Sequence, residues 1–136
     1  MKFLIIDAQG GGIGRSAVTS LKSAFPEAEI IAVGTNTTAT SAMIKAGADH
    51  GATGENAVVV CSKEVDYIVG PIGIVIADSM YGEITPKMAV AVGQSKAERI
   101  LIPMRNCRNT VAGIKSYQID SLIEAAIEEI KAKISK

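Results

Sequence analysis

The chain has 136 residues, a formal net charge of zero at pH 7 and 48% hydrophobic residues. This length predicts one domain over residues 1–136, and the balance of 14 basic against 14 acidic residues argues against nucleic acid as a partner, because contact with a phosphate backbone requires a basic excess. A single histidine, His50, and two cysteines without CxxC spacing argue against a four-ligand zinc site and are typical of a reducing compartment.

The first half of the chain alternates strands with helices. Residues 3–6 form a continuous apolar run, which is typical of a strand buried on both faces. A glycine-rich loop follows, and apolar residues at helical spacing then predict a helix that starts at Ile13 and ends at Pro26. Residues 29–33 predict a second strand, and the helix after it should end at Gly47.

The middle of the chain is ambiguous. Residues 53–60 begin with capping residues but continue with three valines, so helix and strand both remain open, and we favour the helix. Residues 67–69 predict a short strand that ends at Gly70 and Pro71. Because proline is well suited to the first turn of a helix, we expect the apolar residues 72–80 to form a buried helix.

The last third is more regular. Thr85 and Pro86 are typical of a helix start, and this helix should end at Gly93. Residues 99–103 predict a strand, and residues 111–114 predict one more. Isoleucines at helical spacing over residues 119–134 predict a C-terminal helix, with a capping box formed by Ser121 and Glu124.

This order predicts a three-layer, Rossmann-like α/β fold with a mostly parallel sheet. Ligands of such sheets bind beyond the carboxyl ends of the strands, where the strand order reverses. Because the apolar run at residues 3–6 is cut by Asp7 and no stretch reaches the roughly 18 apolar residues of a membrane helix, we expect a cytoplasmic protein without a membrane partner.

Four glycines, Gly10, Gly11, Gly12 and Gly14, cluster after the first strand. Each glycine loses up to about 1 kcal/mol relative to alanine on folding, so a phosphate-binding loop is a better explanation than a plain turn. The strict G-x-G-x-x-G pattern of dinucleotide loops fails, because the last glycine is replaced by Arg15.

A related dinucleotide loop, the G-x-x-x-G-I-G of short-chain dehydrogenases, fits except at Ala8. The Tyr-x-x-x-Lys pair of those enzymes is absent, since none of the three tyrosines has a lysine four residues later. The second strand also lacks the acidic residue that holds the ribose of NAD. Thr35 and Asn36 would tolerate a 2′-phosphate, so NADP fits better than NAD.

An alternative is a deviant P-loop that binds ATP. Residues 9–16, QGGGIGRS, resemble the G-K-G-G-I-G-K-S loop of nitrogenase iron protein at five of eight positions, but Gly10 and Arg15 replace its two lysines. Ser16 could reach Mg²⁺ in such a loop, and residues 74–78 resemble a strand that ends in a Mg²⁺-binding aspartate, Asp78.

Several polar residues have two equally good interpretations. Asp7 could contact a ligand hydroxyl or cap a backbone amide, and Asp78 and Glu83 could form an acidic pair or serve turn chemistry. Arg105 and Arg108 are the best side-chain cations for an anionic ligand. His50 fits a surface loop better than a catalytic base, and Cys107 has no visible base partner as a nucleophile.

Sequence blocks along most of the chain, up to about Lys115, together resemble one family: IIDAQGGGIG, AVGTNTTATSAMIKAGADHGATGENA, DYIVGPIGIVIADSMYGEITPKMA and ILIPMRNC. It is a conserved family of small bacterial proteins, mostly from anaerobic Firmicutes, catalogued as a domain of unknown function. The resemblance implies a cytoplasmic setting and no activity. Glycine usually fills the position of Ala8 in that family and lysine that of Arg15, so both departures fall in the glycine loop.

We therefore expect the protein to bind a nucleotide, NADP-like or otherwise, or another phosphorylated small molecule at the strand ends. No residues form a catalytic set, so an enzyme and a non-catalytic sensing or assembly protein both remain open. The apolar segments 70–80 and 88–92 are consistent with a homo-oligomer. No metal is expected, and the expected ligand contacts are Gly10, Gly11, Gly12, Ile13, Gly14, Arg15, Ser16, Thr35, Asn36 and Gly70.

Overall fold

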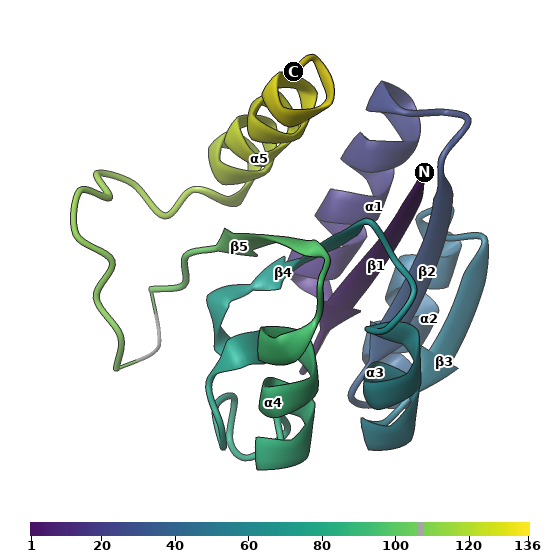
Figure 1. Ribbon diagram of the computed structural model, residues 1–136. Coiled ribbons are helices and arrows are strands. Elements are labelled where there is room, and N and C mark those ends of the chain that lie inside the picture. Colours follow the sequence, from purple (N-terminus) through teal and green to yellow (C-terminus); the bar gives the residue numbers. More distant parts are fainter. Residues whose placement is uncertain (106–107) are drawn as a thin grey trace.

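The computed structural model describes residues 1–105 and 108–136, so Cys107 lies outside the described residues. Five strands form one parallel sheet in the order β3-β2-β1-β4-β5 (Figure 1). The strands are β1 (Lys2–Asp7), β2 (Glu29–Gly34), β3 (His50–Thr53), β4 (Tyr67–Pro71) and β5 (Glu98–Ile102). The predicted α/β fold with a parallel sheet is confirmed.

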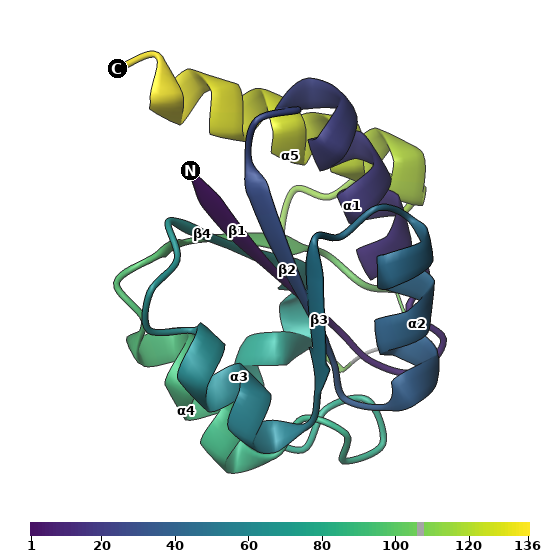
Figure 2. The same ribbon diagram turned by 90° about the vertical axis from the view of Figure 1, so that its right-hand side faces the viewer.

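Helices cover both faces of the sheet, which gives the three layers seen in Figure 2. One face carries α1 (Gly12–Ala24), α2 (Thr37–Lys45) and α5 (Ile119–Ile134). The other carries α3 (Glu55–Cys61) and α4 (Pro86–Gln94). Each crossover thus connects parallel strands through a helix, as parallel pairing requires.

The apolar run of β1 explains why both faces are covered. Side chains alternate along a strand, so Phe3 and Ile5 enter the core under α1 and α5, whereas Leu4 and Ile6 enter the core under α3 and α4. All four side chains are 0% exposed. Full burial of such a side chain stabilises the fold by about 1.5–3 kcal/mol, so this central strand anchors both layers.

Most helix ends lie where the sequence predicts them. Asn36 caps α2 by accepting a hydrogen bond from the Ala39 amide at 2.8 Å, and Gly47 follows that helix with φ = 117°. Thr85 caps α4 by accepting from the Met88 amide at 3.2 Å. The helix favoured for residues 53–60 is confirmed as α3.

Other predictions were wrong. Residues 50–53, which include His50, form the edge strand β3, whose short, polar and mostly exposed sequence carries no apolar signal. Only residues 72–75 of the expected helix over 72–80 are helical, as a 3-10 turn, and Asp78 and Met80 then adopt left-handed backbone conformations.

Near the C-terminus, residues 111–114 form no strand. The last helix begins at Ile119, capped by Gln118 rather than by a box at Ser121. Helix α4 includes Gly93 and ends one residue later. Among the described residues, no helix combines the length and apolar composition needed to cross a membrane.

Candidate functional site

The strand order reverses between β1 and β4. The chain leaves β1 toward α1 on one face of the sheet, and it leaves β4 toward α4 on the other. The two connections therefore diverge at the carboxyl ends of neighbouring strands and leave a crevice between them, the position where parallel α/β sheets bind ligands. The glycine loop forms one wall of this crevice.

Two of the four loop glycines are required by the fold. Gly11 has φ = 75°, and a Cβ atom there would lie 2.9 Å from the Cα of Ala39. A Cβ on Gly14 would lie 2.6 Å from the sulfur of Met43 and 2.9 Å from the Cβ of Asp7. Larger residues at these two positions would push α1 away from α2 or from β1.

The other two glycines have no such packing reason. A Cβ on Gly10 or Gly12 would meet nothing within 4 Å, and neither residue has a positive φ. Both residues are exposed. The fold itself would accept alanine at these two positions. Packing within the chain therefore does not explain why both residues are glycines, whereas close approach of a ligand would.

The same loop leaves backbone amides unpaired. The Gly11 amide donates to the Ala8 carbonyl at 3.0 Å, and the Gly14 amide donates to the Asp7 carboxylate at 2.6 Å. Within residues 1–105 and 108–136, the amides of Gly10, Gly12 and Ile13 have no hydrogen-bond partner. These three N–H groups lie at the N-terminus of α1, where the helix dipole favours an anion.

Asp7 lies beneath the loop and is 4% exposed. One carboxylate oxygen accepts from the Ala8 amide at 2.8 Å and the other from the Gly14 amide. Burial raises the pKa of Asp7 above its ordinary value; the two hydrogen bonds oppose this shift, and the nearby Glu83 carboxylate adds to it. Of the two interpretations offered by the sequence, the structure shows the capping one.

Glu83 joins three connections at the carboxyl edge of the sheet. Its Oε1 atom accepts hydrogen bonds from the Gln9 amide at 2.9 Å, the Thr35 hydroxyl at 2.5 Å and the Asn36 side-chain amide at 2.8 Å. Burial acts to raise the pKa of Glu83, but these hydrogen bonds together lower it below its ordinary value. Glu83 is therefore ionised at neutral pH.

Sequence reasoning did not bring Glu83 to the end of β2. Its partners Thr35 and Asn36 are 48 and 47 residues away in the chain. The path of residues 76–84 across the strand ends is what brings the Glu83 carboxylate to these two donors. The predicted contacts Thr35 and Asn36 thus lie at the crevice, with side-chain donors engaged by Glu83.

A cavity of about 740 Å³ lies beside the glycine loop. The loop contributes Gln9 and Ile13, residues 76–81 form a second wall, and the chain after β5 forms a third wall. That third wall carries Arg105 and Arg108, and the Arg105 guanidinium lies 5.3 Å from the ring centroid of Tyr117. The cavity therefore combines apolar surface with two cations.

The wall over residues 76–82 has an unusual backbone. Asp78, Met80 and Tyr81 have φ values of 66°, 55° and 59°, and Tyr81 is 99% exposed. Such conformations are costly for residues other than glycine and concentrate at functional sites. This connection is thus built from constrained turns rather than from the helix that its apolar sequence suggests.

Three of the predicted ligand contacts have other surroundings. Arg15 lines a separate groove between α1 and α2, together with Lys45. Ser16 is half-buried in the first half of α1. A Cβ on Gly70 would overlap the Ile6 carbonyl, so this glycine allows β4 to approach β1 inside the sheet.

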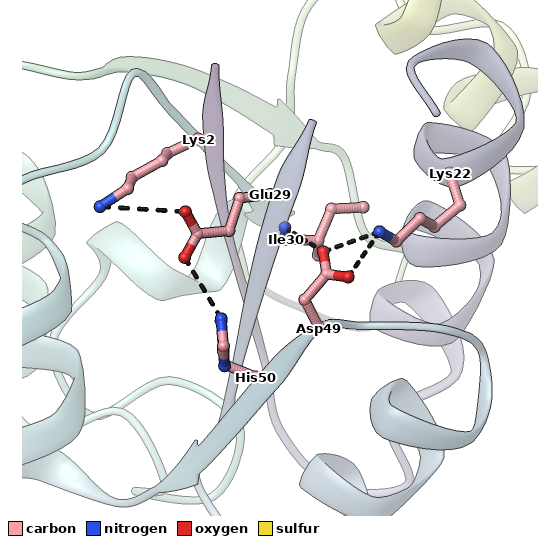
Figure 3. A network of polar contacts seen from close by, with 6 residues as sticks. All are labelled: Lys2, Lys22, Glu29, Ile30, Asp49 and His50. Carbon is pink, nitrogen blue, oxygen red and sulfur yellow. Dashed lines mark hydrogen bonds and ion pairs between the residues drawn. The ribbon is translucent and has the colours of Figure 1, made fainter. Parts of the chain in front are cut away.

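His50 is the first residue of β3 and lies at the amino ends of the strands, away from the crevice (Figure 3). Its Nε2 is 3.3 Å from the Glu29 carboxylate, which also lies 4.0 Å from the Lys2 ammonium group. Beside them, Asp49 accepts from the Lys22 ammonium at 2.7 Å and from the Ile30 amide at 2.8 Å (Figure 3). These contacts tie the amino ends of β1, β2 and β3 together.

Metal-ligating side chains do not gather in the part of the chain that the structure describes. No three His, Cys, Asp or Glu residues come close enough there to hold a metal ion. Asp78, the residue expected to end a magnesium-binding strand, lies instead in a left-handed turn. The strand that the P-loop alternative would need over residues 74–78 is not formed, because this segment turns immediately after β4.

The fold and the crevice define a Rossmann-like α/β protein. The chain belongs to the family described as "Domain of unknown function (DUF3842)", whose model matches residues 2–135, so the expected membership in a family of unknown function is confirmed. No curated protein sequence matches the chain.

Among solved structures, the chain resembles a dodecameric FMN-dependent Ubix-like decarboxylase from Escherichia coli O157:H7. The TM-score is 0.54 and the sequence identity is 14%, and the match covers 100% of this chain and 96% of the other. At this identity the likeness establishes the shared fold.

Proposed function

We propose that this protein binds a nucleotide, or another phosphorylated small molecule, in the crevice between the glycine loop and residues 76–84. One phosphate group accepts hydrogen bonds from the amides of Gly10, Gly12 and Ile13. The observation that carries the proposal is the division among the glycines: packing requires Gly11 and Gly14, whereas Gly10 and Gly12 border open space beside unpaired amides.

The adjacent cavity supports a ligand with an apolar or planar part. Its 740 Å³ is within the range of small-molecule sites, and its lining mixes apolar side chains with the cations of Arg105 and Arg108. FMN is the first ligand to test, because the structural neighbour is FMN-dependent. NAD and NADP are the next, since a dinucleotide could place its diphosphate on the loop and its ring in the cavity.

ATP is a weaker candidate. The buried Asp7 carboxylate already takes the Gly14 amide, and Glu83 places a second negative charge nearby. A triphosphate carries more charge than three backbone amides and an α-helix terminus compensate next to two carboxylates. Arg15, the residue that would stand in for the P-loop lysine, lines a different groove.

A thermal-shift panel of FMN, NAD, NADP, AMP and ATP tests the proposal. A ligand present at 100 times its Kd stabilises the native state by about 2.7 kcal/mol, and for a domain of this size that raises Tm by roughly 8–15 °C. The informative variant is Gly12→Asp, which adds a carboxylate at the first position of α1. An acid there stabilises the helix and repels a phosphate, so binding should be lost while stability is kept.

Gly93→Asp is the matched control. Gly93 also lies in a helix, has open space around its Cβ position and has no positive φ. This variant should bind as the wild type does. A panel without any shift, or a Gly12→Asp variant that keeps full affinity, contradicts the proposal.

A non-catalytic sensing or assembly role is the second candidate. It is favoured by the lack of a nucleophile–base pair among the described residues lining the crevice. We further propose a cytoplasmic setting and a homo-oligomer. Light scattering coupled to gel filtration measures the assembly directly, and a monomer at micromolar concentration would contradict the homo-oligomer.

A further inference from the structure

The carboxyl end of the second strand is the place where dinucleotide-binding folds recognise a ribose. An acidic side chain there accepts hydrogen bonds from the ribose hydroxyls, whereas a 2′-phosphate needs a cation instead. In this chain β2 ends at Gly34 and is followed by Thr35 and Asn36, so no acidic residue stands at this strand end in the sequence. The structure brings a carboxylate to this point from elsewhere, since Glu83 of the β4–α4 connection contacts both Thr35 and Asn36.

We propose that Glu83 is the ribose-recognising residue of the crevice and selects nucleotides with an unmodified 2′-hydroxyl group. This inference rests on the proposed function, because it assumes that a nucleotide occupies the crevice. It reverses the preference that the sequence alone indicates, since Thr35 and Asn36 without Glu83 would suit a 2′-phosphate.

The hydrogen bonding of Glu83 supports this role. All three donors converge on Oε1, and over the described residues Oε2 has no hydrogen-bond partner. An ionised carboxylate accepts about four hydrogen bonds, so one oxygen holds the side chain in place and the other remains available. A group fixed in advance loses little side-chain entropy when a hydroxyl binds to it.

The charge of Glu83 gives the selectivity its direction. A carboxylate accepts from a hydroxyl but has no proton to offer a phosphate, and the two anions repel each other. Thr35 and Asn36 cannot compensate, because their donors already point at Oε1. Among the described residues, the cations Arg105 and Arg108 line the cavity beside the glycine loop, and Glu83 is not part of that lining.

Three adenine nucleotides separate the possibilities: AMP, 2′-deoxy-AMP and adenosine 2′,5′-bisphosphate. Titration calorimetry on the wild type should give affinities in that order. Loss of the 2′-hydroxyl should weaken binding about tenfold, and a 2′-phosphate should weaken it at least as much. NAD should likewise bind more tightly than NADP.

The variant Glu83→Gln keeps the size and one acceptor oxygen but removes the charge. The ratio between AMP and the bisphosphate should fall to about threefold or less, while Glu64→Gln, an exposed acid far from the crevice, should keep the wild-type ratio. If Glu83 has only a structural role, Glu83→Gln should change the affinities for all three nucleotides by the same factor. That result would overturn the inference.

Two further outcomes are equally informative. If Glu83 instead fills the place of the ligand and closes the site, Glu83→Gln tightens all three nucleotides together, and the inference is wrong although the proposed function holds. If AMP, NAD and FMN all fail to bind the wild type, the nucleotide form of the proposed function is wrong and the inference falls with it.

Discussion

The variant Asp7→Asn measures how much the carboxylate beneath the glycine loop stabilises the fold. Each oxygen of Asp7 accepts one backbone N–H, from Ala8 at 2.8 Å and from Gly14 at 2.6 Å. Asparagine offers one oxygen and places an NH₂ group against the second donor. One hydrogen bond to a charged acceptor is lost, which costs about 1.5–3 kcal/mol, and a buried donor remains unpaired.

An opposing contribution comes from the charge itself. Burial raises the pKa of Asp7 above 3.8, so the fold disfavours the ionised carboxylate, and the neutral amide avoids that cost. The lost hydrogen bond and the unpaired donor should prevail at pH 7. We expect the free energy of unfolding to fall by about 2 kcal/mol.

The pH dependence follows from the same pKa. A carboxyl group whose pKa is raised in the folded state makes the protein more stable as the pH falls through that pKa toward 3.8. Asparagine lacks this dependence, so the difference between wild type and variant should widen on acidification.

Urea unfolding followed by circular dichroism at a series of pH values measures both effects. Asp66→Asn is the control, because Asp66 accepts the Lys2 amide at 2.8 Å at an exposed position and should cost less than about 1 kcal/mol. Equal stability of Asp7→Asn and wild type at pH 7, or a difference that narrows on acidification, would refute the reasoning.

Three further substitutions test the packing and the opposite edge of the sheet. Gly70→Ala places a Cβ against a carbonyl of the neighbouring strand and should cost about 1–3 kcal/mol in thermal unfolding, whereas Gly93→Ala should be neutral or stabilise by up to about 1 kcal/mol; equal effects would contradict the close approach. Asp49 has a lowered pKa, chiefly because Lys22 donates a hydrogen bond to it. The ionised Asp49 carboxylate therefore stabilises the folded state above pH 3.8, and this stabilisation is lost as the pH falls through the pKa of the folded state. Asp49→Asn should therefore lower the urea midpoint modestly at pH 7 and by less at pH 2, and an equal loss at both pH values would exclude the ion pair as its cause. Ile130→Ala removes a 0% exposed side chain of α5 and should cost about 2–5 kcal/mol, and an unchanged Tm would mean that α5 does not dock on the sheet.

Local sequence signals predicted the elements whose stability is decided locally. The apolar run of β1 and the isoleucine spacing of α5 are patterns within a few residues, and the cap Thr85 accepts a hydrogen bond from an amide three residues along the chain. The edge strand β3 escaped prediction because its hydrogen bonds belong to β2, and an exposed edge needs no apolar side chains.

In the glycine loop, too, some features follow from the local sequence and others depend on tertiary contacts. Its sequence predicts a strand-to-helix turn with free amides, and the structure places that turn at the reversal of strand order. Which glycines the fold requires could not be predicted, because the atoms nearest to a Cβ at Gly11 and at Gly14 belong to α2, more than twenty residues away, with Asp7 of β1 also close to Gly14.

The sequence by itself thus determined a parallel α/β sheet of Rossmann type with a glycine loop after its first strand. Only the tertiary structure decided that Arg15 lines a groove between α1 and α2 and that Glu83 contacts the residues that follow β2. The physical reason is the range of the interactions. Helix caps and apolar periodicity act over a few residues, whereas the charge at the strand ends depends on how the β4–α4 connection crosses the sheet.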